Sequence, residues 1–164
     1  NRGVGNGLCL PAGPLREPLD RIEDADFFIS SSKIIDLNTK HHKYLMNYQP
    51  IEWARIADNK RFRADSWPLS KNVHAVAGIS NPAKFYKTLS GLGLNPIHHS
   101  FPDHYQFSEE DLDFNDTLPI IMTEKDAVRC LDMRNKNLWY LSVEAKFEEK
   151  ELAEQILTKI SNKN

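Results

Sequence analysis

The fold is decided by a short apolar run with the sequence VHAVAGISNP at residues 73–82. Its first half is apolar apart from one histidine and leads to Gly78, which is typical of a parallel strand buried on both faces. Ser80 and Asn81 then precede Pro82, and a polar cap before a proline favours the start of a helix. The run therefore predicts a strand followed at once by a helix.

The same alternation continues from this run to the C-terminus. Three more apolar runs are expected as strands, at residues 97–101, 118–122 and 138–143. Helices are expected from Pro82 to about residue 91, over 124–131 and over about 148–161. The pattern predicts an α/β fold with three α/β/α layers and a mainly parallel, doubly wound sheet. Ligands of such sheets bind outside the carboxyl ends of the strands, which here means the loops 78–82, 102–105 and 123–126.

The part of the chain before residue 73 is less regular. Residues 27–30 are expected as a buried strand, whereas residues 36–72 are polar with scattered aromatic side chains. Two short strands around Pro50 are expected there, as an extended, partly β linker. We therefore divide the chain into three segments, residues 1–35, 36–72 and 73–164.

Composition narrows the class of protein. The 164 residues include 21 Lys and Arg against 23 Asp and Glu, a net charge of −2. This balance argues against nucleic acid as the main partner. Cys9 and Cys130 are far apart and fit a reducing compartment without a metal or redox motif. The sequence also holds no G-x-x-x-x-G-K-[ST] loop, so nothing in these 164 residues alone cradles a triphosphate.

Two strand-end loops carry candidate chemical groups. His104 beside Asp103 suits a general base, because the pKa of histidine lies near working pH; alternatively, this pair only shapes a turn. Lys125 and Asp126 follow a strand and open a helix, where backbone N–H groups and a lysine favour an anion. The alternative for this second pair is a plain helix cap with an exposed first turn.

The first eighteen residues form a loop rich in glycine and proline. Its Arg16 and Glu17, between two prolines, are candidates for binding phosphate and Mg²⁺ respectively, or else form a surface ion pair. The pairs His41–His42 and His98–His99 lack the spacing of a metal site. His98 and His99 are expected to point to opposite faces of their strand.

Four stretches in order resemble the tetraacyldisaccharide 4'-kinase family, which phosphorylates a lipid A precursor. They are RGVGNGLCLPAGPLREP at residues 2–18, AVAGISNP at 75–82, FPDHY at 101–105 and MTEKDAVRC at 122–130. One such motif is weak, but four in order cover almost the whole chain. Val4 and Ser80 depart mildly from the family pattern.

The resemblance implies transfer of the ATP γ-phosphate, with Mg²⁺, to the 4'-hydroxyl of a lipid A disaccharide 1-phosphate at the cytoplasmic face of the inner membrane. It implies that residues 1–35 are the tail of a second α/β domain, the P-loop domain, and that residues 73–164 are the C-terminal domain. His104 matches the family's catalytic histidine and Glu17 an acidic residue near Mg²⁺. The remaining site positions that it implies are Asp103 as catalytic, and Asn6, Arg16, Lys125 and Asp126 as substrate- or nucleotide-binding.

The family's Walker A loop has no counterpart in this sequence. We therefore expect the chain to be the C-terminal portion of such a kinase, inactive by itself, with the membrane contact made by the missing N-terminal part. The alternative is a non-catalytic α/β binding or scaffold module derived from the kinase.

Overall fold

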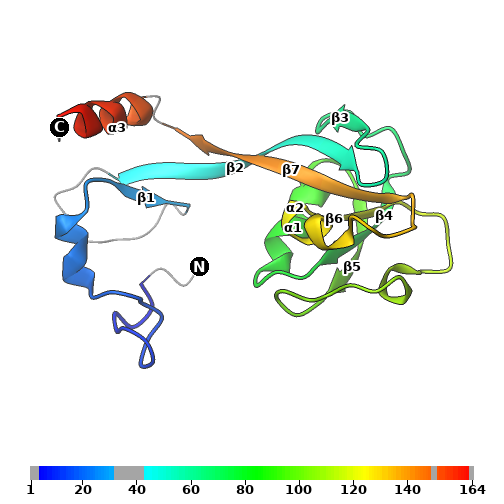
Figure 1. Ribbon diagram of the computed structural model, residues 1–164, viewed down its shortest axis with the longest axis horizontal. Helices are drawn as coiled ribbons and strands as arrows, with labels where there is room; N and C mark the ends of the chain where they lie inside the picture. The colour runs from blue at the N-terminus through cyan, green and yellow to red at the C-terminus, as the bar shows by residue number, and fades with distance from the viewer. Residues whose placement is uncertain (1–3, 32–42, 149–150, 163–164) are drawn as a thin grey trace. The chain divides into compact units, whose positions relative to one another are not determined.

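The computed structural model describes residues 4–31, 43–148 and 151–162 (Figure 1). Its strands are β1 (Phe28–Ser30), β2 (Lys43–Arg55), β3 (Arg61–Arg63), β4 (Asn72–Ala77), β5 (Asn95–Ser100), β6 (Ile120–Thr123) and β7 (Leu138–Phe147). Its α-helices are α1 (Pro82–Gly91), α2 (Glu124–Ala127) and α3 (Leu152–Ser161). Three 3₁₀ turns complete it, η1 (Leu19–Asp24), η2 (Glu110–Leu112) and η3 (Val128–Cys130).

The contacts divide the chain into two units. Unit 1 comprises Asn1–Gln49 and Ala145–Asn164, and unit 2 comprises Pro50–Glu144. The strand order is β1-β2-β7-β6-β4-β5, with β3 paired to β2, so β2 and β7 contribute residues to both units. The three segments expected from the sequence, with boundaries after residues 35 and 72, stay a prediction.

The sheet of unit 2 is mostly parallel. β4 pairs in parallel with β5 on one side and with β6 on the other, and β6 pairs in parallel with β7. From β4 the chain passes through α1 to β5 on one side of β4. It then crosses to β6 on the other side of β4 and continues outward to β7. This reversal is the topological switch of a doubly wound sheet, so the predicted fold class is confirmed.

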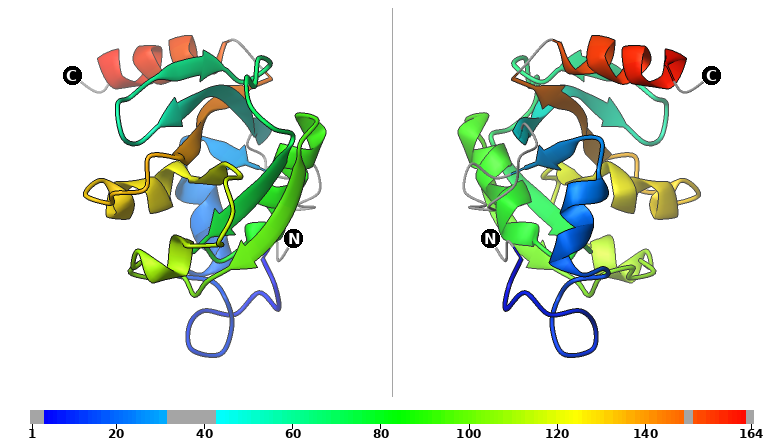
Figure 2. Two further views of the ribbon diagram at one scale, coloured as in Figure 1. Left: turned by 90° about the vertical axis from the view of Figure 1, so that its right-hand side faces the viewer. Right: turned by 90° about the vertical axis from the view of Figure 1, so that its left-hand side faces the viewer.

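Both faces of this sheet are buried. Along β4, Val73, Ala75 and Ala77 belong to one apolar cluster, whereas Val76 belongs to the other. The first cluster also takes Phe85, Tyr86 and Leu89 from α1, and the second takes Ala127 and Cys130 from α2 and η3. Figure 2 shows α1 in green and α2 in yellow on different sides of the strands.

One linker prediction is wrong. The expected two short strands around Pro50 are a single strand, β2. β1 pairs with Lys43–Leu45 and β3 with Glu52–Ala54, so Pro50 falls between the two paired segments. Proline has no backbone N–H to donate. Because Pro50 lies outside the segments that pair with β1 and β3, neither pairing loses a hydrogen bond there, and the strand continues through it.

Two expected helices are shorter than the sequence suggests. The segment 124–131 is α-helical only to Ala127 and continues as the 3₁₀ turn η3. α3 begins at Leu152, and residues 149–150 of the predicted helix lie outside the described residues. Its apolar face is only partly covered, since Leu152 is buried while Leu157 and Ile160 are exposed. In the part of the chain that the structure describes, no helix has the length and apolar character needed to span a membrane.

Candidate functional site

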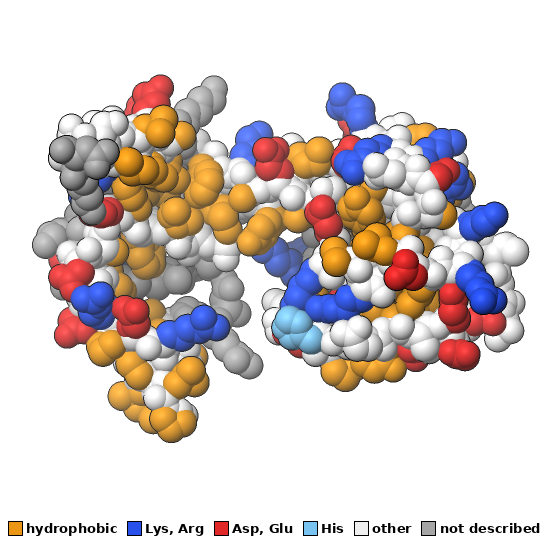
Figure 3. All heavy atoms as spheres, viewed as in Figure 1, with side chains coloured by type: hydrophobic (Ala, Val, Ile, Leu, Met, Phe, Trp, Pro, Cys, Tyr) orange, Lys and Arg blue, Asp and Glu red, His pale blue; other side chains and the backbone are white. Residues whose placement is uncertain are grey.

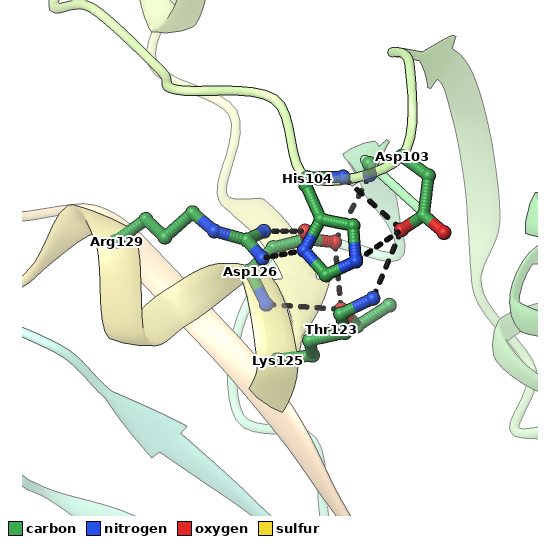
Figure 4. A network of polar contacts seen from close by, with 7 residues as sticks. Asp103, His104, Thr123, Lys125, Asp126 and Arg129 are labelled. Carbon is green, nitrogen blue, oxygen red and sulfur yellow. Dashed lines mark hydrogen bonds and ion pairs between the residues drawn. The ribbon is translucent and has the colours of Figure 1, made fainter. Parts of the chain in front are cut away.

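The loops that follow β4, β5 and β6 meet at one edge of the unit 2 sheet (Figure 4). The Gly78 N–H donates to Asp126 Oδ2 at 3.0 Å, and the Gly78 carbonyl accepts from the His104 N–H at 3.3 Å. Lys125 Nζ lies 2.9 Å from Asp103 Oδ1. The structure thus brings together His104, Asp103, Lys125 and Asp126, all at strand ends where a parallel sheet binds its ligands.

Gly78 is required by the close approach of these loops. A Cβ atom at this position would lie 3.1 Å from Asp126 Oδ1 and 3.3 Å from the Pro102 carbonyl oxygen. A larger residue would push the loop after β5 away from the start of α2. The glycine therefore sets the distance between the two loops that carry the candidate groups.

Asp126 is the buried centre of the site. Its side chain is fully buried and accepts from the Gly78 N–H, from Thr123 Oγ1 at 2.6 Å and from Arg129 Nη1 at 3.1 Å. Its own N–H donates to Thr123 Oγ1 at 3.2 Å, so Thr123 is the N-cap of α2. A buried carboxylate needs such partners because its desolvation is costly. Asp126 therefore holds loops together and is not open to a ligand.

His104 has a constrained backbone and an exposed ring. Its φ is 63°, in the left-handed region that non-glycine residues seldom occupy, and its N–H also lies 3.1 Å from Asp103 Oδ1. The side chain is 70% exposed, and Arg129 Nη2 lies 3.1 Å from its Nδ1 atom. The fold thus presents this imidazole outward while one ring nitrogen is already engaged.

Asp103 is paired mainly with Lys125. The hydrogen bond from Lys125 lowers the pKa of the Asp103 carboxyl below its ordinary value, and burial opposes this shift only in part. His104 Nε2 lies 3.9 Å from Asp103 Oδ1, which is too long for a hydrogen bond. Asp103 is therefore an ionised partner of Lys125 at the rim of the site.

Arg129 is a site residue for which the sequence analysis gave no role. Its side chain is 16% exposed and contacts both Asp126 and His104. The signal was present, because residues three apart on a helical turn are neighbours and Asp126 opens that turn. Figure 3 shows basic side chains beside a histidine on the visible face of unit 2.

The three other predicted site residues lie in unit 1. Asn6 stabilises its own loop, donating to the Ala12 carbonyl at 2.9 Å and accepting from the Leu8 N–H at 3.2 Å. Glu17 pairs with Arg21 of η1 at 3.3 Å, so the suggested ion pair of Glu17 with Arg16 is wrong. Arg16 is exposed, and no described residue forms an ion pair with it.

A bound divalent cation would find few ligands here. Among residues 4–31, 43–148 and 151–162, no group of three His, Cys, Asp or Glu side chains is arranged to hold a metal. Glu17 is an exposed single carboxylate, which suits only Mg²⁺ that keeps its waters and shares phosphate oxygens.

The histidines of β5 behave as the strand pattern predicts. His98 stacks on Tyr86, with ring centroids 4.0 Å apart, whereas His99 Nε2 lies 2.9 Å from His74 Nδ1. The two side chains therefore point to opposite faces of the strand. The pKa of His99 lies below the ordinary value for histidine, mainly because burial disfavours the charged ring. His41 and His42 lie outside the described residues.

The sequence is similar to known proteins over almost its whole length. Residues 1–161 match the family described as tetraacyldisaccharide-1-P 4'-kinase. A tetraacyldisaccharide 4'-kinase of Hahella chejuensis is 44% identical over 144 residues, which is 88% of this chain and 41% of the relative. The corresponding protein of Alkalilimnicola ehrlichii is 45% identical over 148 residues, or 90% of this chain and 43% of the relative.

A solved structure has the same fold. LpxK from Aquifex aeolicus, crystallised in complex with ATP, is similar with a TM-score of 0.67 and 27% identity, over 92% of this chain and 47% of that one. The chain therefore spans less than half the length of the relatives that it matches. With a match over nearly all of its own length, the chain belongs to the tetraacyldisaccharide 4'-kinase family.

Proposed function

We propose that this chain is part of an ATP-dependent kinase that phosphorylates the 4'-hydroxyl of tetraacyldisaccharide 1-phosphate in lipid A biosynthesis. The observation that carries the proposal is the convergence of three family motifs at one sheet edge. His104 from the loop after β5 is brought together there with Lys125 of α2 and Arg129 of η3. A histidine and two cations at the carboxyl ends of parallel strands suit a phosphorylated ligand.

The chemistry of phosphoryl transfer explains what these groups do. The transferring group spreads negative charge over its oxygens, and catalysis consists mostly of positioning and of stabilising that charge. His104 is the exposed group proposed to contact the reacting atoms, while Lys125 and Arg129 supply positive charge beside it. Asp103 orients Lys125 and keeps it at the rim.

ATP and Mg²⁺ are the proposed co-substrate and cofactor. When bound, Mg²⁺ neutralises charge on the nucleotide phosphates. In this chain Glu17 is the carboxylate proposed to hold it, with waters and phosphate oxygens as the other ligands, and Arg16 and Asn6 belong to the same loop. Glu17 exchanges its partner Arg21 for the ion in this proposal.

The 164 residues alone are proposed to be inactive, because the sequence has no Walker A loop. We propose that the complete protein supplies that loop in a P-loop domain, of which residues 1–35 form the tail. The substrate is a lipid, so the proposed place of action is the cytoplasmic face of the inner membrane, with peripheral attachment.

The test is transfer of labelled γ-phosphate from ATP to tetraacyldisaccharide 1-phosphate by the complete protein, with Mg²⁺. His104→Gln removes the imidazole and is expected to lower kcat about 100-fold or more while the KM for ATP changes little. His98→Gln, on the other face of β5 from the partly buried His99, is the matched control and is expected to keep wild-type kcat.

Two results would contradict the proposal. A His104→Gln protein with normal kcat would remove His104 from the reaction. A complete protein that transfers no phosphate would instead support a non-catalytic binding module built on the same fold.

A further inference from the structure

Arg129 lies between two hydrogen-bond acceptors, the buried carboxylate of Asp126 and the exposed ring of His104. One amino group of its guanidinium, Nη1, donates to Asp126 Oδ1 at 3.1 Å, and the other, Nη2, lies 3.1 Å from His104 Nδ1. Both contacts are drawn in Figure 4. The planar guanidinium thus spans from a fully buried carboxylate to a ring that is 70% exposed. It links the buried centre of the site directly to the ring of His104.

The anchor of this arginine is fixed. Asp126 Oδ2 is taken by the Gly78 N–H and the Thr123 hydroxyl, so Oδ1 remains for Arg129. The Arg129 side chain is itself only 16% exposed. A guanidinium fork whose one arm is held by a buried carboxylate leaves its other arm in a set direction. That direction leads to the imidazole of His104.

The contact decides which nitrogen of His104 carries the proton. A guanidinium has only N–H donors and no acceptor, so the His104 Nδ1 atom must offer its lone pair. The neutral ring then carries its hydrogen on Nε2. Among the described residues Nε2 makes no hydrogen bond, because Asp103 Oδ1 is 3.9 Å away. The ring therefore presents an unused N–H group to the outside of the site.

The backbone adds to this orientation. The φ of 63° at His104 is kept by hydrogen bonds from its N–H to the Gly78 carbonyl and to Asp103. A residue in this sparsely populated region persists only where its surroundings determine it. Side chain and backbone are thus held independently, by Arg129 and by Gly78.

We propose that Arg129 is a positioning residue that holds His104 in the Nε2–H form and aims this N–H at an oxygen of the phosphoryl group. The inference deepens the proposed kinase function and rests on it. In this arrangement His104 donates a hydrogen bond to the transferring group. Service as a general base, which the sequence suggested, requires the ring to give up its contact with Arg129 first.

Two substitutions separate positioning from folding. Arg129→Met removes every donor and leaves Asp126 without its cation. Arg129→Lys keeps the positive charge beside Asp126. A single ammonium group cannot, however, reproduce the two fixed amino groups that donate to Asp126 and to His104. In the complete protein we expect both variants to lower kcat about 10- to 100-fold with little change in the KM for ATP. Arg63→Met, in the exposed pair with Asp65 on β3, is the control.

The second readout is the ring itself. Two-bond ¹H–¹⁵N correlation spectra of the histidine-labelled complete protein report which nitrogen is protonated, and His104→Gln identifies the signal. We expect the Nε2–H form in the wild type and in Arg63→Met, and a mixture of forms in both Arg129 variants. If Arg129→Met fails to fold, Arg129→Lys still gives both readouts.

The outcomes are distinct. An Nδ1–H ring in the wild type, or Arg129 variants with unchanged spectra and unchanged kcat, would overturn the inference. A fixed Nε2–H ring that depends on Arg129, in a protein that transfers no phosphate, would overturn the proposed function while the contact between Arg129 and His104 stands.

Discussion

Asp126 joins the carboxyl ends of β4 and β6 through one buried carboxylate. The Gly78 N–H, the Thr123 hydroxyl and the Arg129 guanidinium all donate to it. Its contacts are therefore structural ones at the centre of the candidate site, whereas the motif resemblance implied a ligand-binding role. We propose that the exposed groups around it face the ligand.

Replacing Asp126 by alanine is expected to destabilise the fold by about 3 to 5 kcal/mol, because three donors lose their acceptor and Arg129 is left without its buried partner. Urea unfolding followed by tryptophan fluorescence measures this cost. Asp65→Ala, which breaks an exposed pair with Arg63, is expected to cost less than about 1 kcal/mol. Equal costs for the two variants would contradict the assigned role.

Asp103 gives a prediction about pH. The hydrogen bond and charge of Lys125 lower the pKa of Asp103, so its folded-state pKa lies below the unfolded one. The ion pair therefore contributes fully above the ordinary aspartate pKa and is lost as the pH falls through the lowered value. In Lys125→Met the midpoint of the Asp103 carboxyl titration, followed by ¹³C NMR, is expected to rise.

Asp65 is the internal control for that titration. Its pKa is also lowered, but by Arg63 on another strand. It should titrate identically in wild type and Lys125→Met. An unchanged Asp103 midpoint would show that Lys125 is not its main partner.

At the scale of elements, periodicity predicted β4, β5, β6, β7 and the helix α1, whereas the short strand β3 was not expected. It did so because alternate residues of β4, β6 and β7 enter two cores on opposite faces, which requires continuous apolar runs. Periodicity wrongly predicted a break at Pro50. The proline is tolerated inside β2 because the strand pairs with β1 before it and with β3 after it. The residues next to Pro50 do not show that one half of β2 pairs with β1 and the other half with β3.

The helix α3 shows the same limit and offers a test. Periodicity groups Leu152, Ile156, Leu157 and Ile160 on one face. Leu152, at 2% exposure, is buried and Ile156 is partly buried, but Leu157 and Ile160 are exposed. Leu152→Ala is expected to cost about 2 to 5 kcal/mol, because it leaves a cavity. Leu157→Ala is expected to stay within about 0.5 kcal/mol of wild type.

Urea unfolding followed by circular dichroism compares these two α3 variants. A loss at Leu157 as large as the loss at Leu152 would mean that the exposed end of the helix is covered in solution.

At the scale of the whole molecule, unit 2 contains both apolar cores. Every member of the two clusters lies between Trp53 and Leu141. Trp53 is fully buried, and its Nε1 atom donates to the Ala64 carbonyl at 3.0 Å. A domain that began at residue 73, as the sequence pattern suggests, would lack both residues.

We therefore expect a chain of residues 50–144 to unfold cooperatively, with dispersed amide NMR signals. A chain of residues 73–164 is expected to be less stable, because its core lacks Trp53 and Ala64. Thermal unfolding of the two fragments decides between the two divisions. Higher stability of 73–164 would favour the boundary expected from the sequence.

The sequence was enough to predict the alternation of strands and helices after residue 73, the loops that carry the motifs, and the family to which they belong. These properties reside in local periodicity, in caps and in short motifs, and each can be read within a few residues. Three-dimensional packing was needed to bury Asp126, to bring two loops together at Gly78 and to place Arg129 beside His104, 25 positions away in the chain. The physical reason is that side chains at strand ends meet according to the order of the strands in the sheet. That order is set by packing of the whole unit.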